Sequence, residues 1–133
     1  MKKIIHVSGK RKHAIARATL KEGKGIIRIN SKLLEAYNPR YLRMKIFEPL
    51  ILAGDLAKKV NISVNVIGGG IMGQSEAARL AIARALLEFS QSKQLKNDFL
   101  SYDRHLLIQD TRFGESSKPN DSKPRAKRQK SYR

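Results

Sequence analysis

Residues 13 to 20 read His-Ala-Ile-Ala-Arg-Ala-Thr-Leu, and this stretch alternates regularly between two kinds of side chain. Ala14, Ala16, Ala18 and Leu20 fall on one face of an extended strand, and the intervening residues fall on the other. Successive alanines on one face leave room for a helix to lie close to the strand. The pattern therefore predicts a strand whose small-residue inner face is covered by a helix.

The segments on either side of this strand indicate an α+β domain. The turn at 22–25 predicts a hairpin that joins residues 13–20 to the strand that follows. The predicted strands lie at 4–7, 13–20, 26–29 and 61–67, with a further short strand at 106–109 and a basic turn at 9–12. The predicted helices lie at 40–47, 74–90 and 92–100, with a second apolar piece at 49–57 opened by Pro49.

Positive charge dominates the chain of 133 residues, because 28 Lys and Arg face 11 Asp and Glu, for a net charge of +17. A surface this basic attracts polyanions, so the expected partner is a nucleic acid or an anionic membrane face. The charge gathers at two poles, residues 2–21 and residues 118–133. Hydrophobic residues make up 41%, which is enough for a modest core between these poles.

The carboxy-terminal pole, residues 118–133, contains only two apolar side chains, Ala126 and Tyr132, and it is interrupted by Pro119 and Pro124. Such a segment buries too little apolar surface to offset its ordering entropy. We therefore expect a body at 1–117 and a disordered basic tail at 118–133 that becomes ordered on RNA. Fully extended, its 16 residues would reach up to roughly 50 Å.

Several function classes are disfavoured by composition. The absence of cysteine removes disulfides and thiolate chemistry. The apolar run at the amino terminus is too short for a secretion signal, and charges interrupt every apolar segment, so we expect an intracellular protein that does not span a membrane. His6, His13 and His105 lack metal-ligand spacing, and the carboxylates form no recognisable acid/base pair. We expect no catalysis, metal, cofactor or small-molecule substrate.

Residues 68–73 formally satisfy the G-x-G-x-x-G pattern between a predicted strand and helix. A dinucleotide site would need an acidic residue at the end of a second strand, whereas Glu88 lies inside the helical pattern. A P-loop would need Lys-Ser where Gln74-Ser75 stands. Two interpretations remain: a turn that lets the strand pass close to the helix, or backbone N–H groups that bind a nucleic-acid phosphate.

Four motifs occur in a distinctive order along the chain. They are Gly9-Lys10-Arg11-Lys12 with Ala14, Ala16 and Arg17; Gly68-Gly69-Gly70 with Gly73-Gln74, Ala77, Arg79 and residues 81–86; Ser101-Tyr102-Asp103-Arg104; and the ending Gln129-Lys130-Ser131-Tyr132-Arg133. This ordered set closely resembles the family of ribosomal protein nine of the small subunit, in its archaeal and eukaryotic form. The resemblance covers nearly the whole chain.

This resemblance implies a four-stranded mixed sheet backed by helices, similar to the second domain of small-subunit ribosomal protein five. It also implies a structural component of the head of the small subunit in cytoplasmic ribosomes. Its partners would be small-subunit rRNA, other ribosomal proteins of the head and, through the tail, the anticodon stem-loop of P-site tRNA.

The expected site is a set of phosphate-neutralising and backbone groups. Its predicted RNA-binding residues are Lys10, Arg11, Lys12, Arg17, Gly69, Gly70, Gln74, Arg79, Arg84, Arg104, Arg112, Arg125, Lys127 and Arg128. The tRNA-contacting tip implied by the resemblance comprises Lys130, Ser131, Tyr132 and Arg133. Two alternatives stay open at this point: a DNA-compacting architectural protein, and a nucleotide-binding, kinase-like domain that uses the glycine turn.

Overall fold

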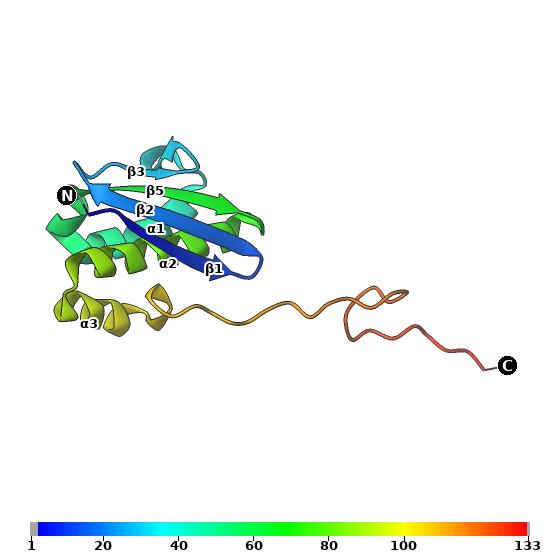
Figure 1. The fold of residues 1–133 in the computed structure, drawn as a ribbon. Coiled ribbons are helices and arrows are strands. Elements are labelled where there is room, and N and C mark those ends of the chain that lie inside the picture. Colours follow the sequence, from blue (N-terminus) through cyan, green and yellow to red (C-terminus); the bar gives the residue numbers. More distant parts are fainter. Residues whose placement is uncertain (1–2, 133) are drawn as a thin grey trace.

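The computed structural model describes residues 3–132 and has the predicted α+β class. Helices α1 and α2 lie on the same side of the sheet, and the chain after residue 113 runs away from the body as an extended segment (Figure 1). The strands are β1 (Ile5–Arg11), β2 (Ala14–Glu22), β3 (Ile27–Ile29), β4 (Lys32–Leu33) and β5 (Val60–Ile67). The helices are α1 (Arg40–Ala53), α2 (Ile71–Ser90) and α3 (Lys93–Tyr102), with 3-10 turns η1 (Leu34–Ala36), η2 (Gly54–Lys59) and η3 (Arg104–Leu106).

The sheet order is β1-β2-β5-β3-β4, so the predicted hairpin between residues 13–20 and 26–29 is wrong. Strand β5 lies between β2 and β3, antiparallel to the first and parallel to the second. The side-chain oxygen of Asn61 accepts hydrogen bonds from the backbone N–H groups of Lys24 (2.9 Å) and Ile26 (3.0 Å). These bonds carry the chain after β2 across the start of β5, instead of back along β2.

The hairpin that does form joins β1 to β2, and its turn lies at Lys12 and His13. Gly9, predicted to open a basic turn, instead lies buried inside β1. Lys12 takes a left-handed conformation with φ 52°, which lets the two strands pair up to Arg11 and Ala14. The basic residues of this motif are thus split between a strand end and a hairpin tip.

The prediction of a small-residue face under a helix is confirmed. Ala14, Ala16 and Ala18 are buried in one core with the alanines of α2, including Ala77 and Ala81. Beside them β1 crosses the same helix through Gly9. A Cβ at this glycine would lie 2.5 Å from the carbonyl oxygen of Ala77 and 2.8 Å from the amide nitrogen of Ala81. The close approach of strand and helix therefore depends on side chains no larger than a methyl group.

The sheet has five strands where four were expected, because β3 turns back into the two-residue strand β4. The turn residues Asn30 and Ser31 both have positive φ, at 49° and 70°, as a two-residue hairpin of type I′ requires. The Asn30 side chain also accepts a hydrogen bond from the backbone N–H of Val66 (2.8 Å) and donates one to its carbonyl (3.3 Å). This side chain continues the pairing with β5 beyond the end of β3.

Helix α1 does not stop at residue 47 but continues through Pro49 to Ala53, which corrects the predicted break. Proline cannot donate the hydrogen bond that would reach the carbonyl of Lys45. Ile46, Pro49 and Leu50 are all buried, and their packing offsets the loss of that one bond. Helix α2 likewise begins at Ile71, three residues before the predicted start.

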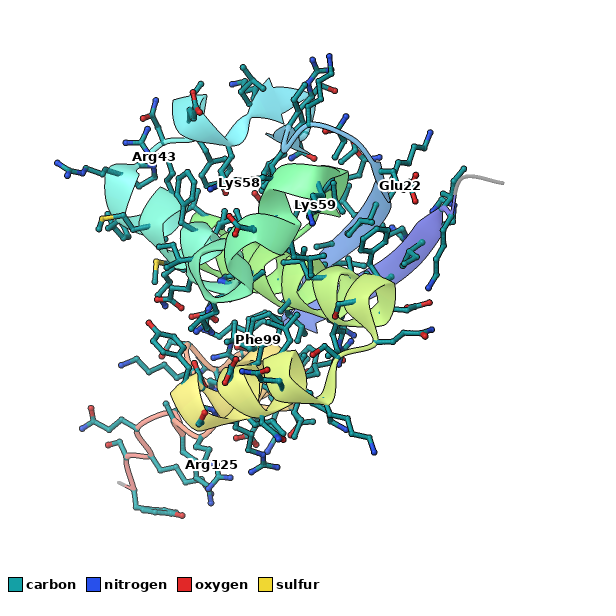
Figure 2. The ribbon with its side chains drawn as sticks, turned by 90° about the vertical axis from the view of Figure 1, so that its left-hand side faces the viewer. Glu22, Arg43, Lys58, Lys59, Phe99 and Arg125 are labelled. Carbon is teal, nitrogen blue, oxygen red and sulfur yellow. The ribbon has the colours of Figure 1, made fainter. Side chains whose placement is uncertain are left out.

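The predicted strand at 106–109 is absent, and a 3-10 turn with an irregular segment stands there. The Asp103 side chain accepts the backbone N–H of His105 (2.9 Å) and so caps the turn. This places Leu106 in a small second core with Phe99 and Leu95 of α3 (Figure 2 labels Phe99). Helix α3 begins as predicted, with the Ser92 hydroxyl accepting the backbone N–H of Leu95.

Within residues 3–132, no helix has the length and apolar character that crossing a membrane would need.

We predict that Gly9→Ala lowers the free energy of unfolding by about 2–3 kcal/mol, because the added methyl group meets backbone atoms of α2 that cannot rotate away. Chemical denaturation followed by circular dichroism at 222 nm measures the change. Gly73→Ala is the control: it lies in α2 and its Cβ would make only ordinary contacts, the nearest at 3.4 Å. We expect it to raise stability by about 0.5–1 kcal/mol. Equal effects of the two substitutions would show that the β1–α2 approach is not tight.

Candidate nucleic-acid interface

The tip of the β1–β2 hairpin carries exposed basic residues next to the base of the tail. Lys12 and His13 are exposed in the turn. The ring of Phe113 lies edge-on to His13, with centroids 5.6 Å apart, and the Lys10 ammonium lies 5.0 Å from the centre of the same ring. We call Lys10, Lys12, His13 and Phe113 the hairpin tip. It brings the amino-terminal basic pole next to Phe113, which lies just before the carboxy-terminal pole in the sequence.

The glycine turn after β5 packs against this hairpin. Gly68 and Gly69 have φ values of 74° and 67°, and Cβ atoms there would lie 2.6 Å from the His13 carbonyl oxygen and 2.9 Å from the Ala14 nitrogen. The Gln74 side chain donates to the carbonyl of Gly68 (3.1 Å) and closes the turn. Close backbone packing therefore accounts for these glycines. Phosphate binding at Gly69, Gly70 and Gln74 stays a prediction, since all three lie beside the hairpin at the start of α2.

Arg11 points to the opposite side of β1 from Lys10 and enters an ion-pair network. Its Nε lies 2.7 Å from Glu76 Oε2, and its Nη1 lies 3.3 Å from Asp110 Oδ2. Lys45 of α1 binds the other oxygen of Glu76 at 3.2 Å. Arg11 also donates to the carbonyl of Arg112 at 3.4 Å. The network thus ties β1, α1 and α2 to the base of the tail.

The carboxylates of this region are held in their charged form. Burial alone would raise the pKa of Glu76, but hydrogen bonds from Arg11 and Lys45 outweigh it, and the pKa is lowered. The pKa of Asp103 is lowered in the same way: burial opposes the shift, and the His105 backbone N–H and the Arg79 guanidinium prevail. Hydrogen bonds from Arg112 bring the pKa of Asp110 well below its ordinary range.

Two more of the predicted RNA-binding arginines serve the body. Arg79 lies 2.5 Å from Glu48 Oε2 and 3.0 Å from Asp103 Oδ2, and its side chain is only 12% exposed. Arg84 donates to the carbonyls of Ser8 (2.9 Å) and Leu107 (3.1 Å). Both side chains therefore join α2 to neighbouring segments. Their partners lie between 23 and 76 residues away in sequence, so no local pattern could have revealed these contacts. Binding of RNA by Arg79 and Arg84 stays a prediction.

The remaining predicted residues of the body face solvent. Lys12, Arg17 and Arg104 are exposed, and within residues 3–132 none has a carboxylate within ion-pair distance. Arg112 is 80% exposed although it binds Asp110 at 2.8 Å. Lys12 belongs to the hairpin tip, Arg112 lies next to it, and Arg17 lies in the middle of β2. The predicted site residues thus form several separate groups.

Beyond Phe113 the chain leaves the body as an extended tail (Figure 1). Arg125 pairs with Glu115 at 2.8 Å, and Figure 2 shows Arg125 on the tail outside the body. Lys127, Arg128 and the described tip residues 130–132 are exposed. Arg133 lies outside the described residues. Among the described residues, the predicted tail cations are therefore exposed, and only Arg125 pairs with a carboxylate, that of Glu115.

The His, Asp and Glu side chains of the described chain form no group of three that could hold a metal ion.

We predict that the ion-pair network stabilises the body at neutral pH and that this stabilisation is lost in acid. Because the pKa of Glu76 is lowered from its ordinary value of 4.5 by folding, its contribution is present at neutral pH and is lost as the pH falls below about 5 and through the folded-state value. Glu76→Gln should lower the free energy of unfolding at pH 7 by about 1–3 kcal/mol. Between pH 7 and pH 3, the free energy of unfolding of Glu76→Gln should fall by less than that of the unsubstituted chain. Denaturant titrations at several pH values measure both effects.

The control is Asp55→Asn, which removes a pair with Lys58 in which both side chains are at least 80% exposed. This change should stay within about 0.5 kcal/mol at every pH. Parallel curves for Glu76→Gln and the unsubstituted chain would contradict the role given to Glu76.

Sequence comparisons with known proteins show the family of the chain. The sequence model of a family described as "Ribosomal protein S9/S16" matches residues 9–133. Proteins named "Small ribosomal subunit protein uS9" from two strains of Methanococcus maripaludis are each 53% identical over 133 residues, covering 98% of this chain and 99% of the relative. A protein of the same name from Methanococcus vannielii is 52% identical with the same coverage. The chain therefore belongs to the ribosomal protein S9/S16 family, whose members are structural proteins rather than enzymes, and it is of the archaeal type.

Proposed function

We propose that the protein is a structural component of the small ribosomal subunit, in the head, and that it binds rRNA there. The relatives that match nearly its whole length are named as small-subunit proteins. The observation that supports RNA binding best is the placement of charge. Acidic residues are used inside the body to pair Arg11 and Arg79, whereas the cations of the hairpin tip and the tail point outward.

The hairpin tip supplies the rRNA contact of the body. Lys12 stands at the end of a rigid two-stranded ribbon, and Arg112 and the start of α2 lie close by. Side chains that are already held in place lose less entropy on binding than freely moving ones do. The contacts of Lys10 and His13 with the Phe113 ring hold this group in place. Phosphate contacts of this kind position a protein on RNA without reading its bases.

The tail supplies the longer reach. Residues 118–133 hold seven Lys and Arg and one Asp. The hydrogen bonds that involve residues 118–132 are local turns, such as Asp121 to Lys118, or the pair between Arg125 and Glu115. Residues 118–132 therefore have no hydrogen-bond or ion-pair partner on the body apart from Glu115. We propose that it threads between rRNA strands and becomes ordered there.

The tail tip, Lys130, Ser131, Tyr132 and Arg133, is proposed to contact the anticodon stem-loop of tRNA in the P site. This assignment rests on family membership and on the length of the extended tail. It places the protein in cytoplasmic ribosomes during translation, beside other ribosomal proteins of the head.

We predict that deleting residues 118–133 leaves the body folded and weakens its binding to small-subunit rRNA. Thermal unfolding should remain cooperative, because every buried core residue lies at or before Leu106. The plot of log affinity against log salt has a negative slope, which should become shallower by roughly 0.7–0.9 for each phosphate that the tail no longer binds. Filter binding between 50 and 200 mM salt measures the slope.

The matched control keeps the tail at full length and replaces its seven cations with glutamine. In this variant and in the deletion, the slope of log affinity against log salt should become shallower by the same amount. Unchanged binding in both variants, or equal affinity of the full chain for duplex DNA of the same length, would contradict the proposed function and favour a DNA-compacting protein.

We predict that Arg133→Ala reduces P-site tRNA binding or decoding fidelity while subunit assembly proceeds normally, because one cation at the tip contributes little to the rRNA contact. tRNA binding to reconstituted subunits and sedimentation of those subunits measure the two effects. Lys118→Ala at the other end of the tail is the control and should leave tRNA binding unchanged. Defective assembly with normal tRNA binding would reverse the assignment.

A further inference from the structure

The sheet face opposite α1 and α2 is not covered by any other element of the described chain. Alternate residues of four strands point to it, and most of them are exposed. We call it the open face. Its central residues are His6 and Ser8 of β1, Arg17, Thr19 and Lys21 of β2, Ser63 and Asn65 of β5, and Arg28 of β3.

The sheet sorts its charges between its two faces. The five strands contain one carboxylate, Glu22, which by alternation falls on the side of Leu20 and α2. On that side Arg11 is paired with Glu76. On the open face Arg17 and Arg28 have no carboxylate within ion-pair distance among residues 3–132. The charged side chains of the open face are therefore all basic, which suits an anionic occupant.

The open face is also hollowed. Two shallow depressions meet at Thr19: one extends toward Arg28 and Ser63, and the other toward Arg17 and Asn65. Arg28 pairs across β5 with the row of Ser63 and Thr19, and Arg17 lies two residues farther along β2. Strand spacing and rise put the Cα atoms of the two arginines roughly 12 Å apart. Extended arginine side chains can span this gap, so the two guanidinium groups can bind one phosphate together or two successive phosphates of one backbone.

The side chains between the arginines determine which anion fits. Ser8, Ser63 and Asn65 offer hydroxyl and amide groups that can donate to phosphate oxygens and bond to ribose 2′-hydroxyls. The Thr19 hydroxyl between them is hydrogen-bonded to His6 Nδ1 at 3.1 Å. The five strands contain no Phe, Tyr or Trp, so the face has no platform on which unpaired bases could stack. These features favour a structured sugar-phosphate backbone over a single strand.

We propose that the open face is a second docking surface, which binds the sugar-phosphate backbone of a folded RNA segment through Arg17 and Arg28 and through the polar side chains between them. The proposal rests on the proposed rRNA-binding function and assigns it a surface separate from the tail. The protein would then be held by RNA on its open face and, independently, at its hairpin tip and tail.

The test compares two double variants of the full chain that lose the same charge. Arg17→Gln with Arg28→Gln removes the open-face arginines, and Lys93→Gln with Lys96→Gln removes two exposed lysines of α3. We expect the open-face variant to bind small-subunit rRNA at least 10-fold more weakly at 150 mM salt. Its salt slope should be shallower by about 0.7–1.8, for the one or two phosphates that the arginines bind, and the α3 variant should change affinity by less than 2-fold. Circular dichroism and thermal unfolding verify that both variants fold.

A photo-crosslinking residue in place of Asn65 identifies the occupant directly in assembled subunits. Adducts with rRNA are expected. Adducts with a protein would overturn the proposal, because a protein would then occupy the open face. Equal losses of affinity in the two double variants would also overturn it, because long-range attraction alone would then explain the loss. If the tail deletion weakens binding while the open-face variant does not, this proposal fails and the proposed function stands. If neither weakens binding, the proposed function fails as well.

Discussion

The approach of α2 to strands β1 and β2 constrains the rest of the structure. It requires Gly9 in β1 and alanines on the facing sides of β2 and α2, because any Cβ at Gly9 would overlap the helix backbone. At the end of the same hairpin, the glycine turn after β5 packs against His13 and Ala14 through Gly68 and Gly69. Packing at methyl-group distance thus determines where the hairpin tip stands.

A net charge of +17 makes the distribution of the few acidic residues important. Glu76 lies on α2, Asp103 and Asp110 lie on the segment that leads to the tail, and each pairs with an arginine. These pairs neutralise the cations that the body needs for its own cohesion. Cations such as Lys12 and Arg17 face outward, where they repel one another until a polyanion arrives. If the protein binds RNA as proposed, its stability would depend mainly on the paired cations and its affinity mainly on the outward-facing ones.

Local patterns predicted the elements better than their arrangement. Alternation identified β2 and β5, and the Ala-rich periodicity identified α2, because burial of one face imposes these patterns on the sequence. The insertion of β5 between β2 and β3 could not be predicted in this way, since strand order depends on contacts such as that of Asn61 with the loop at 24–26. The continuation of α1 through Pro49 depends on buried packing of the same non-local kind.

The candidate site shows the same division. Sequence alone located the basic hairpin, the glycine turn and the cationic tail. It could not separate Arg11 from Lys10, although neighbouring residues of a strand point to opposite faces, because the carboxylate partners of Arg11 lie 65 and 99 residues away. The open face went unnoticed for a related reason. Its members come from strands that are far apart in the chain, and only the sheet order brings Arg17 and Arg28 to one surface.

The fixed exit of the tail has a kinetic consequence. Arg11 and the ring contact of Phe113 hold the start of the tail beside the hairpin tip, so once the body is docked the tail cations are confined to a small volume around it. Their local concentration near the docking site then reaches the millimolar range that is typical of short tethers. Individual tail contacts can dissociate and rebind quickly at such a concentration without release of the chain. A tail of weak, replaceable contacts can therefore yield to moving RNA and still stay engaged.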